Sequence, residues 1–154
     1  QELVAPLRAL GGDVVLTDGP DLDARVRAEI GEAALPLAID AVGGSGTQRL
    51  ARCVSNGGTV VNYGILSGEP CMVDGRETVF RDVRLQGFWL RKWFVDTPPA
   101  QIAALYRELA SWVADGTLAV EVEAVYPIRR IKEAVAHAAR GGRSGKILLS
   151  FARQ

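Results

Sequence analysis

The stretch GGTVVNYG, residues 57–64, decides the fold of this chain. Glycines bracket an apolar run, and this pattern predicts a short buried strand that ends in a turn. Glycine lets the backbone turn with positive φ and lets a ligand approach closely. A second stretch, VRLQGFWL at residues 83–90, predicts another strand with a turn near Gly87. Open α/β sheets bind ligands at the carboxyl ends of their strands, so we expect both turns at one ligand-binding edge.

Both turns also have simpler interpretations. Glycine clusters often mark ordinary turns without binding anything. The ring of Tyr63 fits a wall of the core with its hydroxyl hydrogen-bonded, and three large apolar residues after Gly87 fit a core equally well. Trp93 and Phe94 extend them into an aromatic cluster that suits a hinge, an acyl pocket or a subunit interface.

Strand and helix patterns alternate outward from these two stretches. Helices are predicted over residues 3–10, 22–30, 97–114 and 128–140, and from the turn at residues 43–46 through Cys53, with a possible helical turn at residues 75–81. Strands are predicted over residues 13–17, 35–42, 59–62, 83–89, 120–126 and 146–151. This alternation predicts an α/β fold whose parallel strands are joined by right-handed crossovers.

Two of these elements carry a specific burial prediction. The apolar run at residues 35–42 is continuous, which is typical of a strand buried on both faces. The helix after Thr97 starts with a hydroxyl cap and two prolines. Its predicted buried stripe consists of Ile102, Leu105, Leu109, Trp112 and Val113.

Composition bounds the class of protein. The chain has 154 residues, 48% hydrophobic and 23% charged, which suits one globular domain with a sizeable core. Eighteen basic residues balance eighteen acidic ones, so nucleic acid and anionic membranes are not favoured as partners. No apolar run is long enough to span a bilayer, and no targeting pattern is recognisable. We therefore expect a soluble, cytoplasmic protein.

Cysteine and histidine give no sign of a metal site. Cys53 and Cys71 lie far apart, and the only histidine, His137, follows much later. This spacing matches neither a metal site nor a disulfide framework, so the thiols are interpreted as free. His137 falls on a predicted surface helix, which argues against a catalytic role.

Two further features leave alternatives open. The loop RGGRSGK, residues 140–146, is suited either to holding a phosphate through backbone amides and Lys146 or to lying in solvent. It is not a P-loop, because Ile147 and a strand follow the lysine. Asp40 ends a strand, where its carboxylate suits a cofactor contact or a cap on the next turn. No acid–base or nucleophilic pair is recognisable, so no catalytic residue is assigned.

Taken in order, six segments resemble the medium-chain dehydrogenase/reductase superfamily, in particular its zinc-independent 2-enoyl thioester (enoyl-CoA/ACP) reductase branch. The segments are AIDAVGG at 38–44, RLAR at 49–52, GGTVVNYG at 57–64, SGEP at 67–70, FRDVRLQGFWL at 80–90 and SGKIL at 144–148. The run at 80–90 is fairly specific to that branch, whereas the glycine–strand–glycine unit is common to the superfamily.

The resemblance implies a Rossmann-like, mostly parallel sheet with helices on both faces and NADP as cofactor. By family analogy, the nicotinamide end of NADPH contacts Tyr63, Gly64, Ile65, Leu66, Phe88, Trp89 and Leu90. Lys146 contacts the cofactor from the loop before the last strand. The implied enzyme is an oxidoreductase of fatty acid metabolism that saturates the double bond of a 2-enoyl thioester. No metal is implied.

The family parts that precede these segments are not recognisable in this chain. Residues 1–154 match a partial NAD(P)-binding domain, N-terminally truncated, without the first strand, the glycine-rich loop and the substrate domain. The start at Gln1 suggests a fragment or processed product, and we expect the chain alone not to reduce enoyl thioesters. The resemblance also implies a homodimer formed through the edge strand around residues 83–88.

Other functions remain open at this stage. A quinone or enone reductase and an alcohol dehydrogenase of the same superfamily share the same cofactor half. A truncated, non-catalytic dimerisation module is the alternative that is not an enzyme. The residues do not specify NADP against NAD, the acyl chain length or the catalytic residues.

Overall fold

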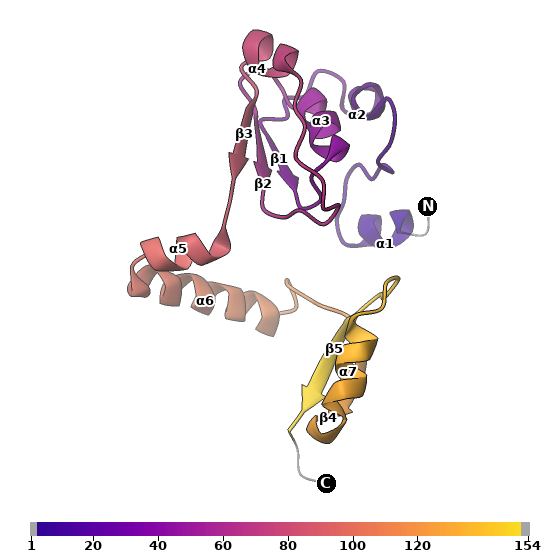
Figure 1. Cartoon of the computed structure of the whole chain (residues 1–154), viewed down its shortest axis with the longest axis vertical. Coiled ribbons are helices and arrows are strands. Elements are labelled where there is room, and N and C mark those ends of the chain that lie inside the picture. The colour runs from indigo at the N-terminus through magenta and orange to yellow at the C-terminus, as the bar shows by residue number, and fades with distance from the viewer. Residues whose placement is uncertain (1–2, 152–154) are drawn as a thin grey trace. The chain divides into compact units, whose positions relative to one another are not determined.

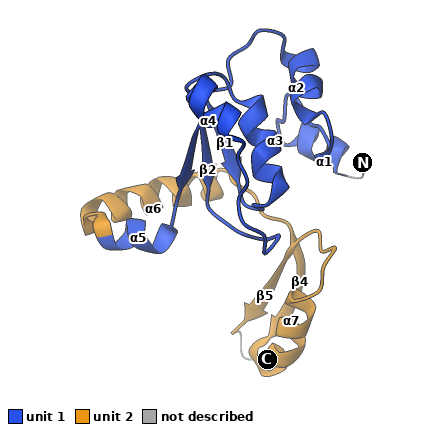
Figure 2. Cartoon of the chain, turned by 45° about the horizontal axis from the view of Figure 1, so that its top comes forward, with its two compact units in different colours: residues 1–95 blue, residues 96–154 orange. Residues whose placement is uncertain are grey.

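The chain divides into two compact units, Gln1–Val95 and Asp96–Gln154 (Figure 2). The computed structural model describes residues 3–151, so Gln1 lies outside the described part. Among these residues, no helix is long and apolar enough to cross a membrane.

The first unit contains a three-stranded parallel sheet in the order β1-β2-β3 (Figure 1). Its elements are α1 (Val4–Ala9), α2 (Leu22–Ile30), β1 (Leu37–Asp40), α3 (Ser45–Cys53), β2 (Thr59–Asn62), α4 (Gly75–Arg81) and β3 (Arg84–Gly87), followed by α5 (Leu90–Asp96). In the sheet register, Ala38 pairs with Val60 and Val60 with Leu85. The predicted parallel α/β fold is confirmed.

The core of this unit lies between the sheet and α3. Ala51, Val54, Val60 and Val83 are at most 3% exposed and form one cluster. The side chains of β1 alternate between two environments. Ala38 packs against the cluster, whereas Leu37 and Ile39 on the opposite face are 54% and 64% exposed. The prediction of a strand buried on both faces is therefore wrong within this unit, because β1 has a helix against only one of its faces.

The second unit pairs two parallel strands with one helix. It contains α6 (Pro99–Ala114), β4 (Val122–Pro127), the 3-10 turn η1 (Ile128–Arg130), α7 (Ile131–Ala138) and β5 (Lys146–Ser150). Strands β4 and β5 form a two-stranded sheet, and α7 packs along them (Figure 1). A register irregularity interrupts the pairing between Val122 and Ala124.

Three sequence expectations about these elements are wrong. Residues 13–17 form no strand, because no described strand pairs with them. Helix α6 begins after Pro98 with no side-chain cap, so Thr97 does not cap it. Its predicted stripe is not buried, since Leu105, Trp112 and Val113 are 37%, 38% and 63% exposed. Helix α5 was not predicted, since its aromatic run lacks helix start and stop signals.

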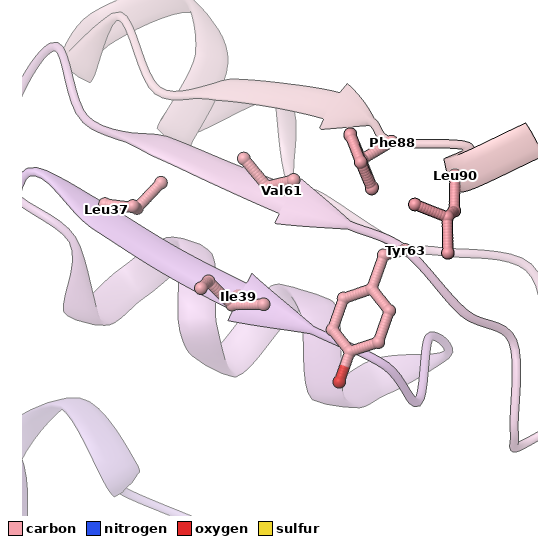
Figure 3. A pocket seen from close by; sticks show the side chains of 6 residues that line it. All are labelled: Leu37, Ile39, Val61, Tyr63, Phe88 and Leu90. Atoms are coloured by element: carbon pink, nitrogen blue, oxygen red, sulfur yellow. The ribbon is translucent and has the colours of Figure 1, made fainter. Parts of the chain in front are cut away.

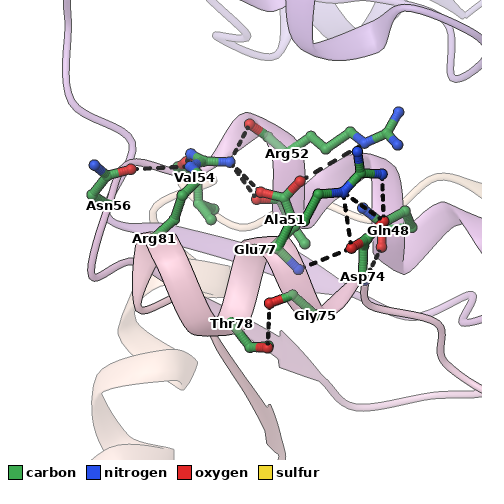
Figure 4. Close-up of polar contacts among 11 residues, drawn as sticks. Gln48, Ala51, Arg52, Val54, Asn56, Asp74, Gly75, Glu77, Thr78 and Arg81 are labelled. Atoms are coloured by element: carbon green, nitrogen blue, oxygen red, sulfur yellow. Dashed lines mark hydrogen bonds and ion pairs between the residues drawn. The ribbon is translucent and has the colours of Figure 1, made fainter.

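Arg81 explains part of the sequence run at residues 80–90. Its guanidinium reaches the C-terminal end of α3, where backbone carbonyls carry partial negative charge (Figure 4). The guanidinium also forms an ion pair with the carboxylate of Glu77 at 2.5 Å. Glu77 is only 9% exposed. The other acceptors of the Arg81 guanidinium are the carbonyls of Ala51, Arg52 and Val54 and the side chain of Asn56. One side chain thus joins α3 to α4.

Replacing Arg81 by alanine should destabilise the first unit by about 2–3 kcal/mol, because the change uncaps α3 and leaves the Glu77 carboxylate without its main partner. Arg84→Ala is the control, since its ion pair with Asp82 is solvent-exposed and should contribute less than about 0.5 kcal/mol. Urea unfolding measures both. Equal midpoints for Arg81→Ala and Arg84→Ala would contradict this role.

Candidate functional site

Two turns leave the same edge of the first unit's sheet. Asn62 at the end of β2 pairs with Gly87 at the end of β3, and the strands run parallel. The amide of Phe88 donates to the carbonyl of Asn62 at 2.8 Å, and that of Tyr63 donates to the carbonyl of Asp40 at 2.9 Å. Residues 63–66 and 88–90 therefore emerge side by side, as the strand pattern predicts.

Three of the predicted site residues line one apolar pocket with a volume of about 450 Å³ (Figure 3). They are Tyr63, Phe88 and Leu90. The remaining lining side chains come from the open face of the sheet and are Leu37, Ile39 and Val61. Sequence reasoning did not include these three, although alternation along strands of known register would have placed them on one face. Only the Tyr63 hydroxyl adds a polar side-chain atom, so the lining of this pocket is almost wholly apolar.

The rest of the predicted turn residues are strongly exposed. Ile65, Leu66 and Trp89 expose 69%, 82% and 65% of their surface. The Arg91 guanidinium carbon lies 6.0 Å from the centroid of the Trp89 ring. Large apolar side chains left in water at the end of a sheet are typical of a surface that another group covers.

Gly64 is required by close approach. A Cβ at this position would lie 2.7 Å from the carbonyl oxygen of Ala41, so any other residue would push the turns after β1 and β2 apart. Gly87 differs, because nothing lies within 4 Å of a Cβ built there. The structure shows no need for glycine at position 87.

The carboxylate of Asp40 organises the turn after β1. It is 3% exposed and accepts the amides of Val42 at 2.8 Å and Gly43 at 3.1 Å. Its second oxygen accepts the hydroxyl of Thr47 at 2.6 Å and the amide of Asn62 at 3.3 Å. Of the two roles considered for Asp40, the structure shows the turn cap.

Asn62 extends this network to the turn after β2. Its side-chain amide also donates to the carbonyl of Gly64 at 2.9 Å. Burial by itself raises the pKa of Asp40, but its hydrogen bonds outweigh burial, and the pKa lies below its usual value. The ionised carboxylate is therefore the form that holds both turns.

Lys146 lies in the second unit, as the first residue of β5. Its backbone amide donates to the carbonyl of Glu121 at 2.7 Å, and its side chain is exposed. In the preceding loop, the amides of Ser144 and Gly145 donate to the Glu123 carboxylate. Those two amides are already occupied, which disfavours the interpretation of this loop as a phosphate cradle.

The thiols and the histidine form no metal site. Cys53 is buried, and burial raises the pKa of its thiol. Within residues 3–151, no group of three or more histidine, cysteine, aspartate or glutamate side chains is arranged to hold a metal ion. The imidazole of His137 contacts two other side chains. It lies between Tyr126 and Glu123, a contact that no sequence signal indicates.

A family model described as zinc-binding dehydrogenase matches residues 10–149. The mitochondrial enoyl-[acyl-carrier-protein] reductase of Dictyostelium discoideum is 28% identical over 98% of this chain, and that of Caenorhabditis elegans is 34% identical over 77%. These matches cover 43% and 33% of the relatives, so the chain spans less than half of their length.

Solved structures agree on the fold. A structure assigned as an NADPH:quinone reductase from Bacillus thuringiensis superposes with a TM-score of 0.82 at 25% identity, covering 97% of this chain and 46% of that one. The mitochondrial 2-enoyl thioester reductase Etr1p/Etr2p heterodimer of Candida tropicalis gives a TM-score of 0.81 at 22% identity, with coverages of 97% and 43%. The predicted Rossmann-like fold is confirmed.

The relatives correct the expected location. The enoyl reductases of Dictyostelium discoideum, Caenorhabditis elegans and Homo sapiens are all named mitochondrial. The prediction of a cytoplasmic protein is wrong by this comparison. Composition could not reveal it, because cellular location is encoded in targeting segments and not in the folded domain.

Replacing Asp40 by asparagine should cost about 1–2 kcal/mol of unfolding free energy at pH 7, because the amide cannot accept all four hydrogen bonds. The pKa of Asp40 is lower in the folded than in the unfolded chain. Its stabilising effect is therefore present above the unfolded pKa and is lost as pH falls through the folded pKa.

Urea unfolding at pH 6 and pH 3 measures this effect as the difference between wild type and Asp40→Asn. The other carboxylates titrate in both proteins and cancel. The difference should shrink at pH 3, and a difference that is constant with pH would contradict the ionised cap.

The matched family covers nearly the whole chain, and the sequence resemblance is confirmed. The enoyl-[acyl-carrier-protein] reductases of Dictyostelium discoideum and Homo sapiens each match 98% of this chain, and the fold agrees with that of the solved enoyl thioester reductases. The chain belongs to the zinc-binding dehydrogenase family, within the medium-chain dehydrogenase/reductase superfamily and its enoyl thioester reductase-like branch.

Proposed function

We propose that this chain is the cofactor-binding portion of an NADPH-dependent oxidoreductase that reduces the double bond of 2-enoyl thioesters. One observation carries the proposal: the turns at residues 63–66 and 88–90 leave adjacent parallel strands at one edge. This is where open α/β sheets bind nucleotides. Support for the substrate comes from the names of relatives, among them an Etr1p structure with NADP and crotonyl-CoA.

The residues present fit a nicotinamide ring. Tyr63, Phe88 and Leu90 form an apolar wall, and the missing Cβ of Gly64 lets the turn after β2 lie close to Ala41 in the turn after β1. When bound, NADPH supplies a hydride to the β-carbon of the enoyl thioester. The chain's own part is to orient the ring and exclude water from it. Ile65, Leu66 and Trp89 are proposed to cover the bound ring, since their exposed apolar surface needs a partner.

On the strength of the resemblance, we propose Lys146 as a contact of the cofactor. Its exposed ammonium group provides a positive charge that suits the anionic cofactor, and the resemblance is what assigns it this role. We also propose that residues 1–154 belong to one partial NAD(P)-binding domain.

Proton transfer is not assigned to the described residues. Of the pocket side chains, only Tyr63 can exchange a proton, and its position belongs to the cofactor turn. We propose that the group protonating the product comes from another part of the enzyme.

A quinone reductase is the second candidate. It is favoured by the Bacillus thuringiensis structure, whose TM-score of 0.82 is close to the 0.81 of the enoyl thioester reductase heterodimer. The apolar wall suits a quinone ring as well as an acyl thioester, so only substrate tests separate the two.

In the full-length protein, Trp89→Ala and Phe88→Ala should each raise the Kd for NADPH about 10-fold, because each removes an apolar cover from the ring. Val79→Ala is the control: it also removes an exposed apolar side chain, from α4, and should leave the Kd unchanged. Fluorescence titration measures the affinities.

The substrate is tested with the same protein. NADPH oxidation should be fastest with crotonyl-CoA, slower with a quinone and absent with a simple ketone. Unchanged affinity in both aromatic variants would contradict the site, whereas faster reduction of the quinone would favour the second candidate.

We propose a homodimer formed through β3. Within the described part of the sheet, β3 is an edge strand, and Leu85 on it is 42% exposed. Because the amides of Arg84 and Phe88 bond to β2, alternation points the amide of Leu85 outward. That donor is free to pair with the same strand of a second copy across a two-fold axis.

Light scattering of the wild type should give twice the mass of the chain at micromolar concentration. Leu85→Pro removes the outward donor at an edge position and should give monomers, whereas Leu85→Ala keeps the donor and should stay dimeric; melting temperatures verify that both variants fold. A monomeric wild type would exclude the proposed dimer.

A further inference from the structure

Glu123 occupies an unusual position in the second unit's sheet. Val122 pairs with Lys146 and Ala124 with Ile147, so two residues of β4 advance while β5 advances by one. Glu123 is therefore the extra residue of a β-bulge. Bulges change the direction of a side chain and are common beside functional sites.

The carboxylate of Glu123 binds the loop that precedes Lys146. One oxygen accepts the amides of Ser144 at 3.0 Å and Gly145 at 3.3 Å. The amide of Gly145 is the main cause that lowers the pKa of Glu123, with further contributions from His137 and Ser144. The carboxylate is therefore ionised while it holds the loop.

The same loop approaches β4 too closely for any residue except glycine at position 145. A Cβ there would lie 2.6 Å from the amide nitrogen of Glu123 and 2.8 Å from the carbonyl oxygen of Glu121. The amide of Lys146 donates to that same carbonyl at 2.7 Å. Three successive amides, at residues 144–146, are thus fixed to one end of β4.

The second oxygen of Glu123 is held by His137. The ring nitrogen Nε2 lies 2.9 Å from this oxygen, and Nδ1 lies 3.0 Å from the hydroxyl of Tyr126. Both contacts are satisfied when Nε2–H donates to Glu123 and Nδ1 accepts from Tyr126, a tautomer assigned from the network. The rings of Tyr126 and His137 also meet edge to face at 6.0 Å.

We propose that Glu123 is a positioning residue, supported by His137 and Tyr126, that fixes the loop at residues 140–145 so that Lys146 meets the cofactor in one place. The cofactor half of this inference rests on the proposed function. The loop half does not, because it depends only on contacts within the second unit.

The long lysine side chain is flexible, and this flexibility explains why a fixed backbone would strengthen binding. A flexible side chain on a mobile loop loses more conformational entropy on binding than one on a fixed backbone. Fixing residues 144–146 to β4 removes the backbone part of that cost before the cofactor arrives. Loss of the Glu123 carboxylate should therefore weaken cofactor binding without changing the charge of Lys146.

The test compares Glu123→Gln with the matched control Glu121→Gln in the full chain. The control makes the same chemical change two residues earlier, and only the backbone of Glu121 contributes to the loop contacts shown above. Tyr126→Phe removes only the hydroxyl that supports His137. Melting temperatures verify that all variants fold.

Two measurements follow on the same samples. Amide hydrogen exchange at Ser144 and Gly145, without cofactor, should become about 10-fold faster in Glu123→Gln and less so in Tyr126→Phe, because a charged acceptor is lost or loosened. The Kd for NADPH should rise about 10-fold in Glu123→Gln, with kcat at saturating NADPH changed much less. Glu121→Gln should match the wild type in both.

Each outcome has a definite meaning. Unchanged exchange at residues 144 and 145 in Glu123→Gln would overturn the inference. Faster exchange with unchanged affinity, in a wild type that binds NADPH, would overturn the link to Lys146. A wild type that binds no NADPH would overturn the proposed function, and with it the cofactor half, whereas the exchange result would still decide the loop half.

Discussion

Parallel pairing of β2 with both β1 and β3 is the constraint on which the rest of the first unit depends. Parallel strands point the same way, so the turns after Asp40, Asn62 and Gly87 must leave at one edge. The pairing also defines the faces: α3, with its own Ala51, buries Val60 on one face, and Leu37 and Ile39 line the pocket on the other. Register thereby decides which apolar residues enter the core and which line the pocket.

Two carboxylates, the buried Asp40 and the exposed Glu123, perform the same physical task in the two units. Asp40 accepts the amides of the turn after β1, and Glu123 accepts those of the loop before β5. Each carboxylate accepts hydrogen bonds from backbone amides, and these bonds contribute to lowering its pKa. Glycine lies beside each of them at a close backbone contact, Gly64 in one case and Gly145 in the other. In each unit, a close backbone contact at a glycine and hydrogen bonds to a carboxylate therefore hold neighbouring turn or loop segments in place.

Local signals predicted several elements with their observed ends. The glycine-bounded run at residues 59–62 is β2, and the possible helical turn at residues 75–81 is the full helix α4. A short apolar segment between turn residues is enough to indicate a strand. Residues 13–17 failed for the opposite reason: a strand exists only through partners, and no described strand offers one. Helix α5 contains Trp93 and Phe94, which the sequence indicated only as part of an aromatic cluster. The site residues were anticipated only in part, since Leu37 and Val61 enter the pocket through register rather than motif.

The sequence alone determined the class of fold, the two turns and the family, because alternating elements and glycine-bounded strands are local patterns. It also indicated Asp40 and Lys146 as residues of interest without deciding their contacts. Only the tertiary structure decided that Asp40 caps a turn, that Glu123 occupies a bulge and that His137 supports it. Those roles depend on strand register and on contacts between residues that are up to about twenty positions apart along the chain. Patterns of 3.6 and 2 residues carry no information about contacts at such separations.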